Sequence, residues 1–313
     1  MTHEPGRGPT ALAGKRSALH LRARILQAIR AFFVERGFLE VETPVRIPAP
    51  APEEHIDAVP SGSWWLQTSP ELCMKRLLAA GYPRVFQLAR CFREGERGRW
   101  HLPEFTLLEW YRAGVDYGAL MEDCEALLAA VAEAVGGVTP AGREGRPVSL
   151  AAPWPRLTVE EAFRRFAGLS AAAALDAGRF DELLVERVEP ELARLATPVF
   201  LVDYPARLAA LARRKPDREE VAERFELYAG GLELANAFSE LTDPAEQRAR
   251  FAAERARRRA QGRPDYPWPE PFLRDLAHLP PSAGIALGVD RLVGLYAGAR
   301  RIDEVVAFAP EDL

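Results

Sequence analysis

Basic and acidic side chains that could bind a phosphate and an amine lie close together in residues 84–112, RVFQLARCFREGERGRWHLPEFTLLEWYR. Two segments rich in β-branched and aromatic residues flank a polar turn, which predicts a pair of antiparallel strands. Because side chains alternate along a strand, one face of the second strand would carry Phe105, Leu107, Glu109 and Tyr111. The turn supplies four basic residues that could hold an anion above that face: Arg93, Arg97, Arg99 and His101. Any one of these residues fits a polar hairpin tip, but the whole set favours a binding site.

A second group of polar residues lies in residues 224–243, RFELYAGGLELANAFSELTD. The Gly-Gly pair between two alternating segments predicts a tight hairpin turn. One face of the second strand would carry Asn236, Phe238 and Glu240. Glu226 and Glu233 flank the turn and could together hold Mg²⁺, provided that a bulge turns Glu233 toward that face. The alternative for each acid is surface solubility, which fits polar residues in an otherwise apolar strand pattern less well.

Two shorter segments offer further groups for a ligand. In residues 68–71, Ser69 is expected to cap a helix, with Pro70 at its first position and Glu71 in its first turn. Glu71 could serve the helix dipole alone, or it could face an amine of a ligand. In residues 284–296, GIALGVDRLVGLY, Arg291 stands where a glycine-containing strand meets a helix. This position suits phosphate binding, and it also suits a buried pair with the preceding aspartate.

The elements that would position these groups follow from apolar periodicity. Helical spacing predicts helices over residues 21–36 and 116–135. Short strands are expected in residues 38–46 and 64–67, and a strongly apolar strand is expected in residues 197–205.

Other segments predict loops and an insertion. Residues 47–63 contain several prolines and are expected to form a loop with an exposed His55. Residues 136–196 are expected to form a helical insertion, and a basic loop is expected at residues 211–220. The arginine-rich run at residues 255–259 is interpreted as the solvated face of a helix or as a patch for an acidic partner.

The composition is that of a globular protein without a general attraction to nucleic acid. The chain has 313 residues, 48% of them hydrophobic, and a net charge of −4. Three cysteines without a CxxC spacing argue against a disulfide framework and a zinc site. The first residues lack the apolar stretch of a signal peptide, and no later segment resembles a membrane span. We therefore expect a cytoplasmic protein.

Taken together, five segments in order resemble the catalytic core of class II aminoacyl-tRNA synthetases of the lysyl type. The helix that ends in EVETPVR resembles the first motif of that family, FRE followed by RWHLPEFTLLEWY the second, and GIALGVDRL the third. TSPELCMKRLLAAG and FELYAGGLELANAFSELTD are similar to the segments between them. The resemblance implies an α+β fold, with an antiparallel β-sheet flanked by helices, and a homodimer.

The resemblance also implies a domain organisation and an activity. A flexible tail (residues 1–14) would precede one catalytic domain (residues 15–313) that contains the helical insertion, without an anticodon-binding OB-fold. This layout, together with PEFTLLEWYR and GLELANAF, resembles the family of elongation factor P-(R)-β-lysine ligases. The implied activity is ATP-dependent activation of (R)-β-lysine, or lysine, as an acyl-adenylate, followed by transfer to a lysine side chain of elongation factor P. Charging of tRNA is not expected.

The same resemblance assigns roles by position. The catalytic residues would be Arg93 at the α-phosphate of ATP and Arg291 toward the outer phosphates. Further residues would contact ATP: Glu94, Gly95, His101, Leu102, Phe105, Glu233, Leu234 and Gly288. Glu226 and Glu233 would hold Mg²⁺. The amino acid, with its two ammonium groups, would be bound by Ser69, Pro70, Glu71, Glu109, Tyr111, Asn236, Phe238 and Glu240.

Three positions differ from a family pattern. Gly95 stands where a glutamate is usual, so either Glu94 or Glu96 takes its place or a nucleotide contact is lost. Leu102 replaces an asparagine of the ligases, and Ala286 matches the ligases where lysyl-tRNA synthetases have glycine. Two other functions fit the sequence: a minimal lysyl-tRNA synthetase-like enzyme that forms lysyl-adenylate, and a catalytically inactive binding paralogue.

Overall fold

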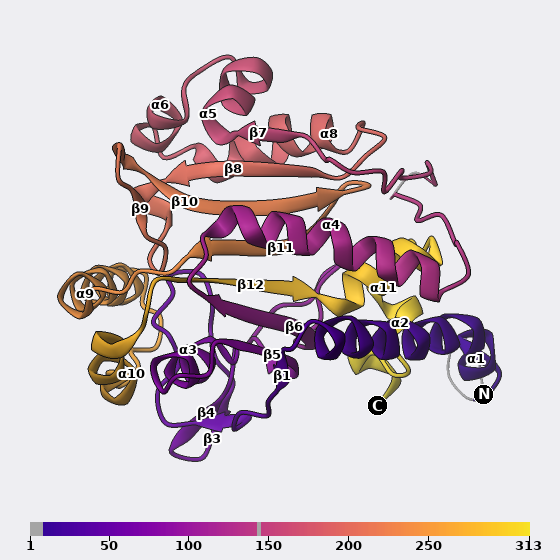
Figure 1. Cartoon of the computed structure of the whole chain (residues 1–313), viewed down its shortest axis with the longest axis horizontal. Helices are drawn as coiled ribbons and strands as arrows, with labels where there is room; N and C mark the ends of the chain where they lie inside the picture. The colour runs from indigo at the N-terminus through magenta and orange to yellow at the C-terminus, as the bar shows by residue number, and fades with distance from the viewer. Residues whose placement is uncertain (1–8, 143–144) are drawn as a thin grey trace.

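One large, mostly antiparallel sheet organises the chain (Figure 1). The computed structural model describes residues 9–142 and 145–313. The main sheet has the order β1-β5-β6-β12-β11-β10-β8-β7, with β9 paired to β10, and only the pairs β1–β5 and β7–β8 are parallel. Its strands are β1 (Leu39–Glu40), β5 (Arg84–Phe92), β6 (Glu104–Ala113), β7 (Arg156–Thr158), β8 (Val199–Pro205), β9 (Arg214–Lys215), β10 (Arg218–Ala229), β11 (Leu232–Ser239) and β12 (Ser282–Gly288). A small separate sheet contains β2 (Arg46–Ile47), β3 (Pro60–Ser61) and β4 (Trp64–Leu66). The expected α+β fold class is thus confirmed.

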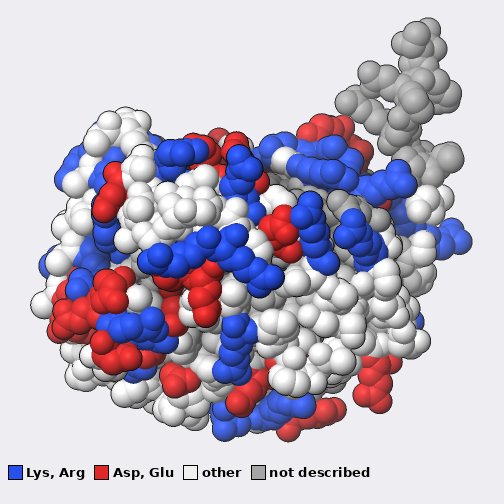
Figure 2. All heavy atoms as spheres, turned by 90° about the horizontal axis from the view of Figure 1, so that it is seen from above, with Lys and Arg blue, Asp and Glu red and all other residues white. Residues whose placement is uncertain are grey.

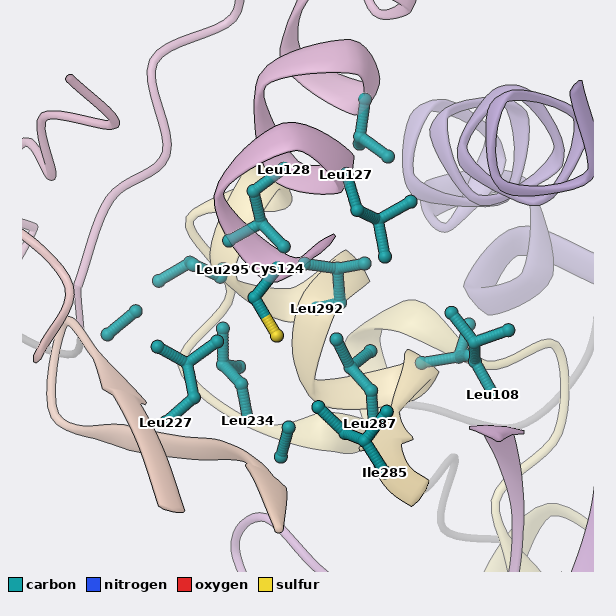
Figure 3. Close-up of a cluster of buried hydrophobic side chains, with 14 of the residues drawn as sticks. Leu108, Cys124, Leu127, Leu128, Leu227, Leu234, Ile285, Leu287, Leu292 and Leu295 are labelled. Carbon is teal, nitrogen blue, oxygen red and sulfur yellow. The ribbon is translucent and has the colours of Figure 1, made fainter. Parts of the chain in front are cut away.

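Three helices cover one face of the sheet and form the main core. They are α2 (Arg16–Glu35), α4 (Tyr117–Ala134) and α11 (Val289–Ala297). Figure 3 shows Leu127 and Leu128 of α4 beside Leu292 of α11, above Ile285 and Leu287 of β12. The helices form because their apolar residues recur at three- and four-residue spacing, so one stripe of each can be buried.

The second face of the sheet is covered by shorter helices and carries the polar residues of interest. These helices are α3 (Glu71–Ala79), α9 (Pro244–Ala260) and α10 (Glu270–Asp275). Met74 of α3, Phe251 of α9 and Phe272 of α10 share a buried cluster with Tyr111 of β6. This packing holds α3 against the face that bears the candidate site.

The expected helical insertion lies along the β7–β8 edge of the sheet (Figure 1). It contains α5 (Val159–Ala162), α6 (Ala171–Asp176), α7 (Phe180–Leu183), α8 (Glu189–Leu192) and the π-helical turns η1 (Phe163–Ala167) and η2 (Leu184–Val188). Its apolar side chains form a separate cluster with residues of β8. The segment is not entirely helical, because β7 lies within it and pairs with β8.

The structure corrects three expectations about elements. Residues 9–14 of the expected tail form α1 (Pro9–Gly14), whereas residues 1–8 lie outside the described residues. The expected basic loop at 211–220 contains β9 and the start of β10. In the arginine-rich part of α9, Arg258 is fully buried (0% exposed) rather than solvated.

The other described elements are short turns between or after the helices and strands. Short 3₁₀ turns occur at η3 (Ala206–Leu208), η4 (Leu276–His278), η5 (Ile302–Val305) and η6 (Pro310–Asp312). Figure 2 shows acidic and basic side chains interleaved on one face of the molecule. Within the described ranges, we find no helix with the length and apolar character needed to cross a membrane.

Candidate active site

The predicted hairpin is present and places the site on one face of the sheet. β5 and β6 pair in register from Arg84–Arg112 to Phe92–Glu104. Across β6, β12 and β11, the pairing aligns two rows of residues: Glu109, Ala286 and Asn236 in the first, and Tyr111, Gly284 and Phe238 in the second. Directly paired residues present their side chains on the same face. Residues far apart in the sequence therefore meet on one surface.

The bulge that Glu233 needs in order to reach this face is present. Glu226 pairs with Asn236 and Leu227 with Ala235, but the next pair is Tyr228 with Glu233. Leu234 is therefore the extra residue, and it turns Glu233 to the face of Asn236.

A cleft of about 430 Å³ opens over this face. Its walls include most of the residues expected to contact ATP, together with two of the expected amino-acid ligands: Arg93, His101, Leu102, Phe105, Glu233, Leu234, Gly288, Arg291, Asn236 and Phe238. Glu94 and Gly95 are exposed and are not among the lining residues. Glu96 lines the cleft instead, with its carboxylate 3.6 Å from the Arg93 guanidinium. Of the two acids considered as substitutes at the Gly95 position, only Glu96 thus reaches the cleft.

Among the charged residues that line the cleft, Arg93 and Arg291 are the two that were expected to bind phosphate. The Arg93 guanidinium lies 5.0 Å from the Phe105 ring centre, and its buried Nε has no hydrogen-bond partner among the described residues. Arg291 Nη1 donates to the Glu233 carbonyl (2.7 Å), and its Nη2 lies 2.7 Å from His101 Nε2. Burial and the Arg291 charge lower the pKa of His101. An unpaired donor and a second arginine suit an anionic ligand such as the phosphates of ATP.

The aspartate before Arg291 does not pair with it, contrary to the alternative that the sequence left open. Asp290 accepts hydrogen bonds from Arg22 of α2 (2.5 Å) and from the Thr106 amide (2.8 Å). This contact ties α11 to α2 and β6. Arg291 therefore faces the cleft.

Two arginines of the hairpin turn do not face an anion site. Arg97 pairs with Glu311 (2.9 Å) and Asp303 (2.8 Å), and Arg99 donates to the Arg300 carbonyl (2.7 Å). The expectation that they would hold an anion above the sheet is therefore wrong. They join the turn to the C-terminal segment instead.

The two carboxylates expected to hold Mg²⁺ differ in their surroundings. Glu233 lines the cleft, with Oε2 3.2 Å from Arg291 Nη1. Glu226 is buried, and it accepts hydrogen bonds from Tyr204 (2.5 Å), Tyr228 (2.8 Å) and Arg224 (2.6 Å). Burial and the nearby Glu233 charge raise the pKa of Glu226. Two neighbouring carboxylates suit a Mg²⁺ that also binds phosphate oxygens. In the described part of the chain, we find no group of three or more His, Cys, Asp or Glu side chains that could hold a metal ion.

The expected amino-acid ligands form a buried cluster beside the cleft. Glu109 is fully buried (0% exposed) and accepts hydrogen bonds from Ser69 Oγ (2.6 Å) and the Tyr111 hydroxyl (2.8 Å). Ser69 Oγ also accepts from the Glu71 amide (3.0 Å). The expectation that Ser69 is the N-cap and Pro70 the first helical residue is wrong by one position, because α3 begins at Glu71 and Pro70 is the N-cap. Phe238 lines the cleft and lies 5.0 Å from the Lys75 ammonium, so the cleft and the cluster are neighbours.

Lys75 is the main residue of the cluster that the sequence analysis missed. Its buried Nζ lies 2.5 Å from Glu71 Oε1 and 2.5 Å from Glu240 Oε2. The i, i+4 spacing of Glu71 and Lys75 in a predicted helix was the signal that could have identified it. The sequence left open whether Glu71 interacts only with the dipole of its helix. It does not, because its carboxylate also pairs with Lys75.

Two carboxylates of the cluster, Glu109 and Glu240, resist ionisation. Burial, reinforced by the charge of Glu71, raises the pKa of Glu109 to about 8. Burial raises the pKa of Glu240 to about 8, although Lys75 lowers it. Gly284 makes this crowding possible, since a Cβ there would lie 2.1 Å from the Tyr111 ring and 2.5 Å from Glu240 Oε1. An incoming cation would relieve the repulsion.

A loop from another part of the chain completes the cleft. Glu53 to Ile56 line it, and burial raises the pKa of Glu53 to about 7. Arg258 of α9 holds this loop by donating to the carbonyls of Glu53 and Ile56 (both 2.8 Å) and to Asp57 (2.7 Å). His55 is exposed, as expected. The sequence analysis did not foresee Glu53, because nothing local indicates that the loop folds over the site.

Comparison with known proteins identifies the family. A family model described as tRNA synthetases class II (D, K and N) matches residues 13–312. The chain belongs to the class II tRNA synthetases. Within this family, it is 40% identical to a protein of Vibrio cholerae named elongation factor P--(R)-beta-lysine ligase, over 93% of this chain and 95% of that protein. A protein of the same name from Edwardsiella ictaluri is 42% identical, over 92% of this chain and 93% of that protein.

A second kind of class II relative matches over a smaller share of its own length. A lysine--tRNA ligase of Moorella thermoacetica is 38% identical, over 92% of this chain and 64% of that protein. Both kinds of relative carry names that refer to lysine or a lysine isomer.

Proposed function

We propose that the chain is an ATP-dependent ligase that activates (R)-β-lysine, or lysine, as an acyl-adenylate and transfers it to a lysine side chain of elongation factor P. The similarity to two ligases of that name, over more than nine-tenths of both chains, supports this proposal. Membership of the class II tRNA synthetases supports the use of ATP.

The observation that carries the amino-acid half of the proposal is the charge of the buried cluster. Glu71, Glu109 and Glu240 share this region with one cation, Lys75. With all four groups ionised, the cluster would carry a formal charge of −2, a state that Glu109 and Glu240, whose pKa values are raised to about 8, reach more readily when cations enter. A lysine isomer brings two ammonium groups, and each requires an opposite charge when it leaves water.

The chemistry needs no nucleophile from the protein. The substrate carboxylate attacks the α-phosphate of ATP, pyrophosphate leaves, and the acceptor amine then attacks the mixed anhydride and releases AMP. Arg93 and Arg291 would stabilise the phosphate charge as it shifts, and Phe105 would stack on the adenine. Glu233 of the cleft and the buried Glu226 would hold Mg²⁺, which would supply positive charge for the outer phosphates. The remaining contacts follow the roles expected from the sequence, except that Glu96 replaces Glu94 and Gly95.

The proposal extends to the assembly and location. Residues 15–313 would act as one catalytic domain in a cytoplasmic homodimer. Large exposed apolar side chains on α2, β1 and β4 support such an assembly. They include Val34 (59% exposed) and Leu39 (48% exposed).

The test offers two acceptors to one enzyme. Labelled (R)-β-lysine and ATP are supplied with either elongation factor P or lysine tRNA, and the label on each acceptor is counted. We expect label on the protein and none above background on the tRNA. Label on the tRNA alone would support the minimal lysyl-tRNA synthetase. If pyrophosphate exchange with both lysine isomers is also absent, the chain is the inactive paralogue.

A further inference from the structure

Lys75 occupies an unusual place for a lysine. It is among the largest fully buried side chains of the protein, and its ammonium bridges two carboxylates from different elements. Glu71 lies one helical turn before it on α3, whereas Glu240 directly follows β11. The bridge therefore fixes the helix to the end of the strand at the amino-acid cluster.

Stability alone accounts poorly for this bridge. Removing a lysine and two carboxylates from water is costly, and apolar side chains of similar volume often serve a core equally well or better. Apolar packing is available at this position, because the Phe238 ring lies 5.0 Å from the Lys75 ammonium. A role in the pocket is the better account of the ion triad.

The surroundings of Lys75 define that role. The acids that interact with it are Glu71 of α3, Glu109 of β6 and Glu240. Tyr111 acts on this group through Glu109, to which its hydroxyl donates. Burial opposes the charge of Lys75, but Glu240 and Glu71 together raise its pKa above the ordinary value. In turn, Lys75 lowers the pKa of Glu240. The ammonium is thus held charged between acids that would otherwise repel one another.

We propose that Lys75 is a positioning residue of the amino-acid pocket, whose ammonium holds the Glu71 and Glu240 carboxylates in place for the ammonium groups of the substrate. The proposal rests on the proposed function, because it requires that a lysine isomer binds at this cluster. Lys75 itself acts on the two acids and not on the reacting atoms.

The test compares Lys75→Met with Arg76→Met in ATP–pyrophosphate exchange, at several pH values and with lysine and (R)-β-lysine. Arg76 is the matched control, since it is the next residue of α3 and pairs with Asp275 nearer the surface. For Lys75→Met, we expect the amino-acid KM to rise about tenfold or more, as when a charge-assisted contact is lost, with the ATP KM within about twofold of the unmodified value. The midpoint of the pH dependence of kcat/KM for the amino acid should move upward. Arg76→Met should change neither quantity.

Each other outcome has a definite meaning. An unchanged amino-acid KM and midpoint in folded Lys75→Met would overturn the proposal, and so would equal rises of both KM values with an unmoved midpoint. If Lys75→Met does not fold, Lys75→Arg keeps the charge but alters its position. It should then raise the amino-acid KM and leave the midpoint in place, and an unchanged KM would overturn the proposal. Absence of exchange in the unmodified enzyme with either isomer would instead refute the proposed function.

Discussion

The Glu109 carboxylate can bind a cation, but its burial lowers the stability of the folded chain when it is ionised. It is fully buried, and Ser69 and Tyr111 orient it by hydrogen bonds. Its pKa lies at about 8, chiefly because of burial and then because of Glu71. A buried carboxyl group with a raised pKa can bind a cation when it ionises. If it ionises with no cation bound, it lowers the stability of the folded chain.

Glu109→Gln should weaken the pH dependence of stability. The folded protein keeps a proton on Glu109 that the unfolded chain releases between the ordinary pKa of 4.5 and about 8. The free energy of unfolding that this retained proton contributes is therefore fully present below pH 4.5 and is lost as the pH rises toward 8, with a slope of up to about 1.4 kcal/mol per pH unit. Urea unfolding across this range should give a shallower decline for Glu109→Gln. Glu104→Gln, at an exposed position of the same strand, is the control, and equal declines in the two variants would contradict the assignment.

Ala286→Gly should alter the choice between lysine isomers. The Ala286 methyl lies on the floor of the cleft, in the row between Glu109 and Asn236. Removing it deepens the floor by one carbon, a change typically worth about tenfold in discrimination. The ratio of kcat/KM for α-lysine to that for (R)-β-lysine should therefore rise in pyrophosphate exchange. Ala283→Gly removes a methyl from the opposite face of the same strand, and an equal shift in that variant would argue against a specific role.

Most of the site could be predicted at the level of residue type, but not its internal pairing. Alternation on a strand was enough to bring Glu109 and Tyr111 to one face. Which partner each charge has depends on contacts from distant segments. Sequence patterns therefore missed the bridge from Lys75 to Glu240, and they left open whether Arg291 pairs with Asp290.

At the scale of elements, the two hairpins and one loop determine the shape of the cleft. Both hairpins followed from alternation and turn residues. Alternation alone placed Glu233 on the opposite face, so the bulge that brings it to the face of Asn236 was only a condition at that stage. The two-residue strands could not be predicted, because so short a strand forms through pairing with a neighbouring strand and has too few residues to show a pattern of its own. The burial of Arg258 was also unpredictable, since an arginine-rich helix end is usually solvated.

Arg258→Met should loosen the loop at residues 53–58. The guanidinium is the shared partner of two loop carbonyls and of Asp57, whose side chain is 25% exposed and also pairs with Arg263 (2.9 Å). Its loss leaves the two carbonyls without that donor, and an unsatisfied buried polar group costs about 1–3 kcal/mol, so urea unfolding should show a loss of this order. Hydrogen exchange should also quicken in the loop. Arg259→Met, which removes a surface arginine one residue away, should do neither. Unchanged exchange in the loop of Arg258→Met would show that other contacts hold it.

At the scale of the whole molecule, the main hydrophobic core and the candidate site lie on opposite faces of the sheet. Helices α2, α4 and α11 cover one face of the sheet, where the main core lies (Figure 1). The opposite face carries the cleft and the buried acids. The fold class followed from the order of motifs in the sequence. The contact between the hairpin turn and the C-terminal segment could not be predicted in this way. It runs from Arg97 to Glu311, which are about two hundred positions apart in the sequence.

The proposed homodimer can be tested through its exposed apolar residues. Val34→Glu places a charge near the end of α2, where the side chain is 59% exposed. A charge buried in an interface is costly, so the variant should sediment as a monomer at concentrations at which the unmodified chain is a dimer. Val185→Glu changes an equally exposed valine of the insertion (56%) and should remain dimeric. A monomeric unmodified chain, or a dimeric Val34→Glu, would contradict the proposed interface.

The most direct test of the central claim is the intact mass of elongation factor P after incubation with the chain, ATP, Mg²⁺ and (R)-β-lysine. The account predicts a mass increase of one lysyl group, which disappears when ATP is omitted or when the Arg93→Ala variant replaces the unmodified chain. Arg93→Ala should remain folded, because its guanidinium faces the cleft and makes few contacts that the core requires. An unchanged mass with the unmodified chain, or an increase of the same size with Arg93→Ala, would contradict it.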